Sequence, residues 1–484
     1  MRQEGHCHLV SYCHYLCGPF RKQLGKKVHI ESYGCQMNLS DSEIVASILA
    51  REGYERAERP EEADLVLLNT CSIRDKAEQT VLNRLDGLTH LKRKNPEMKV
   101  GVLGCMAERM RADLLEKKQL VDLVVGPDAY RSLPGLLDEI GTGQKAVNVL
   151  LSRDETYADI APVRLQTNGV TAFISIMRGC DNMCAFCVVP FTRGRERSRE
   201  PITIVREARD LVRNAYREVT LLGQNVDSFH WSGADGRTTD FADLLAMVAE
   251  VDPLLRIRFS TSHPKDMTDK VLEVMAHHPN ICSYIHLPVQ SGSSAVLQRM
   301  NRGYDRDRYL DRIAAIRHFM PDAAISTDII TGFCGETEED HQDTLSLMRE
   351  VRYDMAYMFK YSERPRTLAA RNYADDVPDD VKGRRLQEVI DLQMRHAADR
   401  NQLHVGKEQE TLVEGVSKRS ADHLFGRNTQ NAVVILPKCN AGHADLRPGD
   451  LITARIRSAT SGSLQGELVR IDHPAPIPKD TIHA

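Results

Sequence analysis

Short runs of β-branched and aliphatic residues alternate with longer amphipathic stretches from Lys27 to about residue 141. This alternation is typical of βαβ units, in which helices connect the parallel strands of one sheet. The clearest strand candidates are residues 28–33, 65–69 and 100–103. We therefore predict a parallel α/β sheet in an amino-terminal domain, residues 26–141.

A second α/β series begins after a polar stretch without periodicity, residues 142–168, which we interpret as a linker. Its candidate strands are residues 172–177, 218–222, 256–260, 284–287, 324–329 and 355–361. Segments of helical length, such as 203–216 and 306–319, separate these strands. Six such repeats predict an incomplete (β/α) barrel over residues 169–400, whose ligands should bind at the carboxyl ends of the strands.

The pattern changes again after residue 400, because the strands of residues 403–471 are short and separated by glycines. This pattern predicts a small antiparallel β-barrel. Residues 1–25 and 472–484 show neither period, and we expect a disordered extension and a flexible tail. The histidines and cysteines of the extension also have the composition of a metal-binding tract.

The 484 residues carry 64 basic and 68 acidic side chains, a net charge of −4, so any RNA binding must depend on local patches. The apolar runs are far shorter than the roughly 18 residues that cross a bilayer. The first twenty residues lack the apolar core of a signal peptide, and we expect a cytoplasmic protein. In that reducing compartment the twelve cysteines are better explained as metal ligands or buried thiols than as disulfides.

Three closely spaced cysteines, Cys180, Cys184 and Cys187, follow the first predicted barrel strand. Three thiolates can bind three irons of a 4Fe-4S cluster and leave the fourth iron open to another ligand. The amino and carboxylate groups of S-adenosylmethionine (SAM) can chelate such an iron, and one electron can then release a 5′-deoxyadenosyl radical. Structural zinc is the alternative, but it needs four ligands, and no fourth Cys or His lies nearby in sequence.

Three further cysteines each follow a predicted strand of the amino-terminal domain: Cys35, Cys71 and Cys105. They are 36 and 34 residues apart, about the length of one βαβ unit. The carboxyl ends of parallel strands lie at one edge of a sheet, which is where ligands bind. Buried free cysteines are also common in protein cores, so position alone leaves both interpretations open.

The segment Gly179 to Cys187, with Phe186 before its last cysteine, resembles the signature of radical SAM enzymes. The sequences around Cys35, Cys71 and Cys105 resemble the amino-terminal domain of the methylthiotransferase family of these enzymes, and the terminal barrel resembles their TRAM domain. Residues 187–199, 222–226 and 361–365 are similar to the members that act on isopentenylated adenosine in tRNA. The chain departs from the family at Arg366 and Leu368, where members usually have Gly and Pro.

This resemblance implies a Rossmann-like amino-terminal domain, a radical SAM barrel and a TRAM domain. It implies one 4Fe-4S cluster on the catalytic residues Cys180, Cys184 and Cys187, and a second on Cys35, Cys71 and Cys105 as the platform for the inserted sulfur. The implied reaction is methylthiolation of C2 of N6-isopentenyladenosine at position 37 of tRNA. That C–H bond is neither acidic nor hydridic, so it requires a radical, while a second SAM supplies the methyl group.

The resemblance also suggests which residues contact SAM, all of them at or after barrel strands, where the fold places ligands. They are Gly223, Gln224, Asn225, Ser262, Gln290 and Asp328. Each could instead be a turn residue or a helix cap. The loop 227–240 with Trp231, the single tryptophan, has the length of a functional lid. Cys282, Cys334 and Cys439 are expected to be apolar filler.

Arginines are the candidates for tRNA contacts, because the guanidinium group binds phosphate bidentately. They are Arg193, Arg195, Arg197 and Arg199 after the first triad, and Arg419 and Arg427 in the terminal barrel, with Arg455 and Arg457 beside them. The first group could instead form a solvated helix face. Further expected partners are the anticodon stem-loop of tRNA and proteins that donate electrons and sulfur. We expect the protein itself to be a monomer.

Two other functions fit parts of this pattern. An enzyme with the same chemistry could modify threonylcarbamoyladenosine in tRNA or an aspartate of a ribosomal protein. A protein of another class would bind RNA and carry clusters without catalysis. Two cysteine triads argue against the second alternative, because a structural cluster is usually held by four protein ligands.

Overall fold

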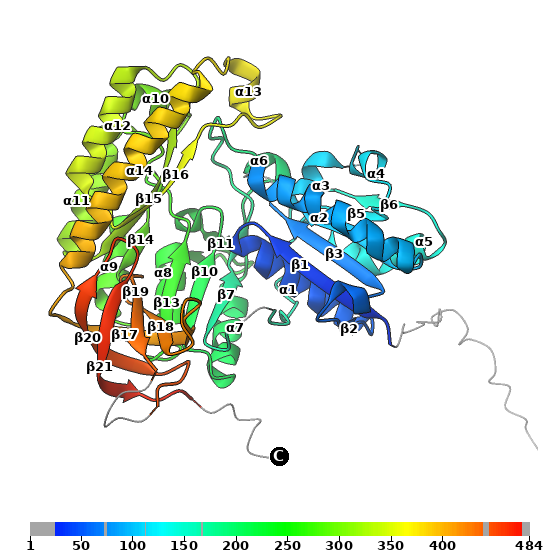
Figure 1. Cartoon of the computed structure of the whole chain (residues 1–484), viewed down its shortest axis with the longest axis horizontal. Coiled ribbons are helices and arrows are strands. Elements are labelled where there is room, and N and C mark those ends of the chain that lie inside the picture. The colour runs from blue at the N-terminus through cyan, green and yellow to red at the C-terminus, as the bar shows by residue number, and fades with distance from the viewer. Residues whose placement is uncertain (1–24, 72–74, 112, 166–167, 439–444, 477–484) are drawn as a thin grey trace, which may run out of the picture.

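The computed structural model describes residues 25–71, 75–111, 113–165, 168–438 and 445–476 (Figure 1). The expectations for residues 1–24, Cys439 and residues 477–484 lie outside this part of the chain. An amino-terminal domain lies beside a larger barrel, and a small barrel lies below the larger one in the view of Figure 1. Within the described residues, no helix is long and apolar enough to cross a membrane.

The amino-terminal domain is built on one parallel sheet of six strands, as the alternation of its sequence predicts. In spatial order the strands are β2 (Glu55–Arg56), β1 (Lys27–Tyr33), β3 (Leu65–Thr70), β4 (Lys99–Gly104), β5 (Leu123–Val125) and β6 (Ala146–Asn148). The chain reverses its direction of travel across the sheet between β1 and β3, and such a reversal opens a crevice at the carboxyl ends of the strands.

Helices cover both faces of this sheet, which is why its central strands are apolar without interruption. They are α1 (Gln36–Arg51) and α5 (Leu133–Gly141) on one face, and α2 (Asp75–Lys94), α3 (Cys105–Met110) and α4 (Asp113–Lys117) on the other. In β3, Leu65 and Leu67 pack against the first group, and Val66 and Leu68 pack against the second. All six residues of β3 are buried, as expected for a strand between two helical layers.

The stretch 142–168, interpreted from its sequence as a linker, is partly integrated into the domain. It contains β6, the last strand of the sheet, and Tyr157 and Ile160 lie in the same core as α1 and α5. The weak periodicity reflects the shortness of β6, which has only three residues. A strand of that length gives too few positions for alternation to be recognised.

Six parallel strands in sequence order form the incomplete barrel. They are β7 (Thr171–Ser175), β10 (Glu218–Leu222), β13 (Arg256–Ser260), β14 (Tyr284–His286), β15 (Ala324–Thr331) and β16 (Met355–Lys360). The first three and the last three pair as separate sheets, which a parallel bridge between Ile257 and Ile281 connects. The prediction of an open (β/α) barrel is therefore confirmed.

Helices lie between these strands and after the last of them (Figure 1). They are α7 (Pro201–Arg213), α8 (Phe241–Ala249), α9 (Asp269–His277), α10 (Ser294–Arg299), α11 (Arg306–Phe319), α12 (Glu338–Val351), α13 (Leu368–Asn372) and α14 (Asp379–Gln402). One continuous apolar core joins strands and helices from Ala172 to Leu392. Two short pairs lie outside this order: β8 (Met177–Arg178) with β9 (Arg197–Ser198), and β11 (His230–Ser232) with β12 (Thr238–Asp240).

The terminal domain is a closed barrel of five strands, as predicted. Its strands are β17 (Glu408–Val416), β18 (His423–Asn428), β19 (Val433–Pro437), β20 (Leu451–Ala459) and β21 (Leu464–His473). It packs against the amino-terminal ends of the larger barrel's strands. There Arg256 donates to the carbonyl of Arg427 (2.9 Å), and Arg258 donates to the carbonyls of Asn428 (2.8 Å) and Thr429 (3.2 Å).

The Arg258→Ala variant should loosen the contact between the two barrels. Arg258 is buried and also pairs with Glu218 (3.0 Å), so its removal should cost about 3 kcal/mol in the free energy of unfolding. Hydrogen exchange should accelerate across β17–β21. Arg457→Ala is the matched control, because the pair of Arg457 with Glu467 is exposed and worth less than about 1 kcal/mol. Equal exchange protection in the two variants would contradict this account.

Candidate functional site

The strand register brings Cys35, Cys71 and Cys105 to one edge of the amino-terminal sheet. Tyr33 pairs with Thr70, and Thr70 pairs with Gly104, so the chain leaves three adjacent strands at the same level. The backbone N–H of Cys71 donates to the carbonyl of Tyr33 (3.0 Å). These cysteines flank the reversal point of the sheet, where parallel α/β folds bind ligands.

Gly34 allows the close approach of these strand ends. Its φ is +131°, and a Cβ on it would lie 2.4 Å from the Cβ of Cys71. An L side chain is excluded there both by the backbone conformation and by the space. The requirement explains why a glycine immediately precedes Cys35 in the sequence.

Two helix amino termini favour negative charge at this edge. Cys35 is the N-cap of α1, and Cys105 is the first residue of α3. Interactions with the thiol of Cys71, the guanidinium of Arg193 and the backbone lower the pKa of Cys35 to about 6, against the opposing effect of burial. Burial has the larger effect on Cys105 and raises the pKa of that thiol.

A buried polar cluster supports the cysteines from behind. The side-chain amide of Asn69 donates to the carbonyl of Asn38 (2.9 Å) and to the hydroxyl of Ser42 (3.0 Å), and the amide of Asn38 donates back to Asn69 (3.2 Å). The thiol of Cys35 also lies 3.1 Å from the side-chain oxygen of Asn38. These contacts explain the polar residues that follow Cys35 on the buried side of α1.

The second triad, Cys180, Cys184 and Cys187, lies on the loop after β7 and β8, at the mouth of the barrel. The N–H of Cys187 donates to the carbonyl of Cys184 (3.0 Å), which closes a turn and brings the last two cysteines together. Gly179 has a φ of +78°, and a Cβ there would lie 2.0 Å from the carbonyl oxygen of Arg195. The loop is therefore held against the segment that follows it.

Burial dominates the protonation of these thiols, raising the pKa of Cys187 to about 12 and that of Cys180 still further. Arg302 provides a compensating charge, since its buried guanidinium donates to the sulfur of Cys184 (3.1 Å). This buried cation favours the thiolate form of the neighbouring cysteine, which is the form that binds metal. A bound metal group would stabilise the thiolates further. Sequence analysis missed Arg302, because it lies 118 positions away from Cys184.

Unsatisfied polar atoms mark a ligand site beside this triad. Both amide atoms of Gln224, the amide oxygen of Asn225 and the hydroxyl of Ser262 are buried without a hydrogen-bond partner in the described structure. Buried polar groups are normally paired, so several orphans together indicate a missing polar ligand. Gln224 and Asn225 follow β10 and Ser262 follows β13, so the orphans come from neighbouring strand ends.

The remaining three SAM candidates have structural partners of their own. Gly223 lacks a side chain because a Cβ would lie 2.7 Å from Cγ of Met177. Gln290 exchanges backbone hydrogen bonds with β15 (2.9 Å to Asp328 and 2.9 Å from Ile330). The partly exposed carboxylate of Asp328 lies 3.5 Å from Nε2 of His286. These residues line the mouth but lack the orphan atoms of the first three.

Three arginines expected to bind phosphate lie instead in the interior. Arg193 pairs with Asp41 (2.8 Å), Arg197 with Asp128 (2.9 Å) and Arg199 with Glu207 (2.9 Å). Each of the three is at most 6% exposed, so none presents a surface to RNA. This corrects the expectation: the side chains of Arg193, Arg197 and Arg199 point inward, because the carboxylates of Asp41, Asp128 and Glu207 bind them.

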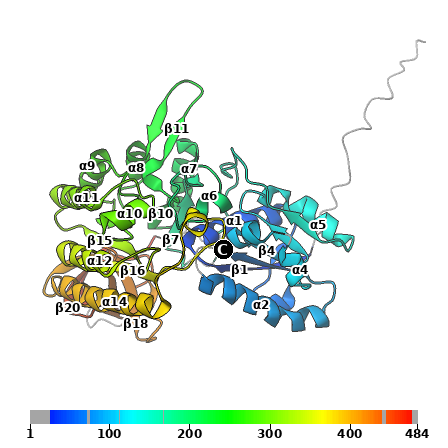
Figure 2. The ribbon, with the colours of Figure 1, turned by 90° about the horizontal axis from the view of Figure 1, so that it is seen from above.

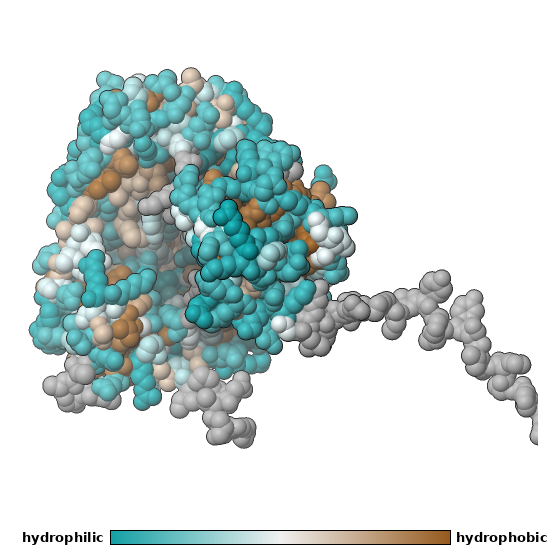
Figure 3. Space-filling view, turned by 45° about the vertical axis from the view of Figure 1, so that its right-hand side comes forward, coloured by the Kyte–Doolittle hydropathy of each residue, from teal (hydrophilic) through white to brown (hydrophobic). Residues whose placement is uncertain are grey.

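The first two of these arginines connect the barrel to the amino-terminal domain. With Arg178, which is completely buried and donates to Asp41 (2.8 Å), they surround Asp41 and Asp128. The ring of Tyr157 lies 4.9 Å from the guanidinium of Arg178. Figure 3 shows a recess between the two domains. Helix α3, which begins at Cys105, contacts the short helix of residues Val189–Thr192 that follows Cys187, so the segments that carry the two triads meet at the domain boundary.

The other RNA candidates differ in exposure. Arg195 is 78% exposed in its side chain and makes only a loose pair with Asp181 (3.3 Å). Arg419 is exposed on the small barrel. Arg427 pairs with Glu414 (3.5 Å) beside the contact with the large barrel, so it is less available than expected.

Two other sequence candidates have clear positions. Trp231 lies on the β11–β12 hairpin, which projects from the barrel in Figure 2, and its ring packs against the barrel core. Cys282 and Cys334 are buried free thiols.

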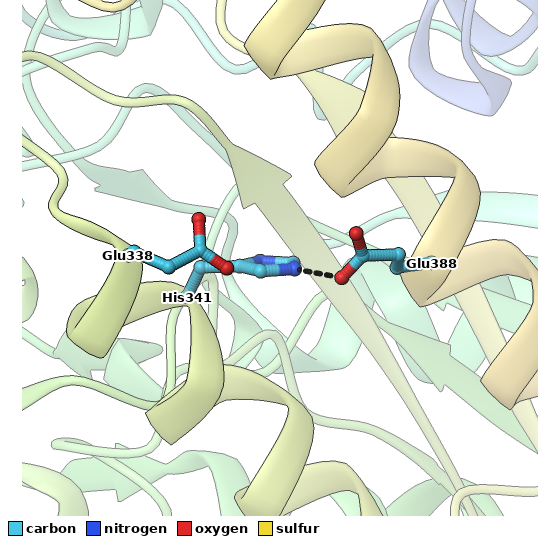
Figure 4. A group of neighbouring side chains, drawn as sticks. All are labelled: Glu338, His341 and Glu388. Carbon is cyan, nitrogen blue, oxygen red and sulfur yellow. Dashed lines mark hydrogen bonds and ion pairs between the residues drawn. The ribbon is translucent and has the colours of Figure 1, made fainter.

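A third group of possible ligands, Glu338, His341 and Glu388, lies between α12 and α14 (Figure 4). His341 contacts Glu388 (2.9 Å), and Arg384 pairs with both carboxylates (2.7 Å and 2.6 Å). Arg384 thus compensates part of the charge of both carboxylates, and Arg385 also contacts Glu338 (3.4 Å). We interpret this group as a structural ion network between two helices.

An open (β/α) barrel with three cysteines and orphan polar atoms at its mouth defines the class of radical SAM enzymes. Residues 174–348 match the model of the Radical SAM superfamily. Residues 27–126 match the uncharacterized protein family UPF0004, and residues 402–469 match the TRAM domain. The chain resembles the solved structure of the radical S-adenosylmethionine methyltransferase TsrM from Kitasatospora setae, with a TM-score of 0.53 and 15% identity over 70% of this chain and 72% of that one. It also resembles the cobalamin-dependent S-adenosylmethionine radical enzyme OxsB, with a TM-score of 0.51 and 13% identity over 77% of this chain and 56% of that one. At these identities the likeness concerns the fold alone.

Curated relatives narrow the class. The tRNA-2-methylthio-N(6)-dimethylallyladenosine synthase of Amoebophilus asiaticus is 58% identical over 92% of each chain. The enzyme of that name from Bacteroides thetaiotaomicron is 56% identical over 92% of this chain and 96% of its own. The chain therefore belongs to the family of tRNA-2-methylthio-N(6)-dimethylallyladenosine synthases, which are radical SAM methylthiotransferases.

The pKa values of the two triads predict different thiol reactivity in metal-free protein. Cys35 is exposed and has a pKa of about 6, so its rate of alkylation by iodoacetamide should level off above about pH 7. Cys187, with a pKa of about 12, should react slowly, and its rate of alkylation should still be rising with pH at about pH 9. Peptide mass spectrometry measures both rates in one sample. Parallel pH profiles for the two cysteines would contradict the assigned environments.

Proposed function

We propose that the chain converts N6-isopentenyladenosine at position 37 of tRNA to its 2-methylthio derivative. The observation that carries this proposal is the presence of two cysteine triads, one at the edge of each domain, on segments that meet at the domain boundary. One triad suffices to make a radical, whereas insertion of sulfur requires a second place to hold it. The relatives named above act, by their names, to form the same nucleoside.

The substrate bond explains why the molecule needs this machinery. The C2–H of adenine offers no proton that a base could remove and no hydride that a cofactor could accept. A 4Fe-4S cluster on Cys180, Cys184 and Cys187 would supply, with SAM, the one-electron chemistry for hydrogen abstraction. A second cluster on Cys35, Cys71 and Cys105 would hold the sulfur to be inserted.

The protein's own residues would bind and orient the reactants. Gln224, Asn225 and Ser262 have the unpaired polar atoms to hold SAM at the barrel mouth, with Gln290 and Asp328 on the opposite strands. Arg302 would stabilise the charge of the Cys184 thiolate. Four of the six thiols are buried, those of Cys71, Cys105, Cys180 and Cys184. Their burial would limit the access of solvent to a reactive radical, since enzymes exclude water where side reactions must be suppressed.

The tRNA contacts are proposed from exposure. Arg195 lies beside the radical triad and Arg419 on the small barrel, and both have solvent-exposed guanidinium groups that could reach phosphate. Arg427 would contribute less, because Glu414 already pairs with it. We include in the proposal that the enzyme acts as a monomer, and that separate proteins supply electrons and sulfur.

Single cysteine variants should separate radical formation from sulfur insertion. After anaerobic reconstitution with SAM, reductant and isopentenylated tRNA, Cys184→Ala should release neither 5′-deoxyadenosine nor methylthio product. Cys105→Ala should still release 5′-deoxyadenosine but form no methylthio nucleoside. Each variant should hold about four irons instead of about eight. Nucleoside mass spectrometry and iron analysis give these results.

The same experiment tests the substrate. The control is tRNA without the isopentenyl group, which should yield no 2-methylthio nucleoside. If wild-type protein releases 5′-deoxyadenosine but methylthiolates only threonylcarbamoyladenosine or a ribosomal-protein aspartate, the substrate assignment is wrong and the radical chemistry stands. Cluster assembly without any SAM cleavage would instead favour a non-catalytic RNA-binding protein.

Gln224→Leu should weaken SAM binding about tenfold or more, because the variant lacks the two buried amide atoms that would form hydrogen bonds with SAM. Equilibrium binding of SAM to protein with both clusters measures the effect. Gln342→Leu is the matched control, since Gln342 lies exposed on α12 and bonds only to Glu338 (3.2 Å). Unchanged SAM affinity in Gln224→Leu would remove Gln224 from the site.

A further inference from the structure

Arg193 is a buried cation whose position the expected RNA contact does not explain. It directly follows α6 (Val189–Thr192), the short helix after the radical triad, and it is only 3% exposed. Its Nη2 lies 2.8 Å from Asp41 of α1. In Figure 1, α6 lies beside α3, whose first residue is Cys105. Arg193 thus belongs to the barrel but lies among the elements that carry the amino-terminal cysteines.

The second half of this guanidinium has no carboxylate or carbonyl partner and is directed at the cysteines, with Cys105 among its side-chain neighbours. Nη1 of Arg193 is buried and makes no hydrogen bond to a nitrogen or oxygen atom within the described residues. The neighbours on which its charge acts include the sulfurs of Cys105 and Cys35. An orphan donor of a charged group costs more free energy than most buried polar atoms, so it indicates a missing anionic partner.

The charge balance at the domain boundary supports the same conclusion. Among these five side chains, Arg178, Arg193 and Arg197 are three cations and Asp41 and Asp128 are two anions, which leaves one positive charge for the cysteine site to meet. The contacts of Arg178 and Arg197 are with these carboxylates and with backbone carbonyls. Arg193 is therefore the arginine whose positive charge acts on the cysteines.

From this geometry we infer that Arg193 is a positioning residue for anionic sulfur at the Cys35, Cys71 and Cys105 site. Its free Nη1 would hold a hydrosulfide-sized anion, in addition to the three thiolates, when that site carries its cluster. Arg is suited to the role because it stays protonated when buried and directs several N–H groups at once. The inference rests on the proposed function, since it requires a cluster on this triad.

The test uses full-length protein in a Cys180→Ala/Cys184→Ala/Cys187→Ala background, so that only the amino-terminal cluster is assembled. Sodium hydrosulfide is titrated into the reduced protein, and electron paramagnetic resonance reports binding through the change in the cluster signal. Potentiometric titration gives the midpoint potential. Neither readout depends on tRNA or on turnover.

Arg193→Gln should weaken hydrosulfide binding by about tenfold or more and lower the midpoint potential, because a nearby positive charge favours both the added anion and reduction. Arg193→Lys should recover part of both. Arg199→Gln is the matched control, because Arg199 is equally buried and paired with Glu207 (2.9 Å) but does not act on the cysteines. It should behave as the parent protein does.

Asp41→Asn gives the opposite sign and does not depend on the folding of Arg193→Gln. Removing the carboxylate that pairs with Arg193 leaves its charge less compensated, so hydrosulfide should bind more tightly and the potential should rise. Parent-like affinity and potential in Arg193→Gln, or a decrease of both in Asp41→Asn, overturns the inference. If the parent protein assembles no cluster on the amino-terminal triad, the proposed function fails as well.

Discussion

The ionic contact between the amino-terminal domain and the barrel determines the geometry of everything chemical in this molecule. Arg178, Arg193 and Arg197 extend from the loop region around the radical triad to Asp41 and Asp128. Charges buried to this degree are stable only when paired, and loss of one partner typically costs about 3–5 kcal/mol. The contact therefore fixes one relative position of the two domains and keeps the segments that carry the two sets of cysteines, α3 and α6, in contact.

Both triads lie at the carboxyl ends of parallel strands. Parallel sheets present their carboxyl ends as ligand-binding edges, in the amino-terminal sheet at the reversal between β1 and β3 and in the barrel at its mouth. The small barrel lies at the opposite end, held by Arg256 and Arg258 through backbone carbonyls. RNA bound to the small barrel would have to extend around the larger barrel to reach the clusters. The rigidity of the contact between the two barrels therefore matters for placing the target nucleotide at the clusters.

Electrostatics divides the arginines of one short segment among different tasks. Arg195 points to solvent, Arg197 and Arg199 compensate carboxylates, and Arg193 has a donor left over beside the cysteines. A composition of closely spaced arginines is compatible with any of these tasks, because the guanidinium binds carboxylate, phosphate and thiolate alike. The partner decides, and for Arg193 and Arg197 that partner lies far away in the sequence, 152 and 69 positions from the arginine.

The sequence by itself determined the three-domain architecture, because hydrophobic periods of two kinds and the glycine-punctuated strands are local properties. It also determined the cysteines, whose spacing after the strands is visible without any contact. The roles of Arg193, Arg197, Arg199 and Arg302 were decided only by the tertiary structure. Asp41 is 152 positions from Arg193, and Cys184 is 118 from Arg302. The first pair exists only after the two domains have packed, and the second only after the barrel has folded. The unpaired polar atoms of Gln224 and Ser262 were likewise revealed only by the tertiary structure, since a missing partner can be recognised only when all the other partners are in place.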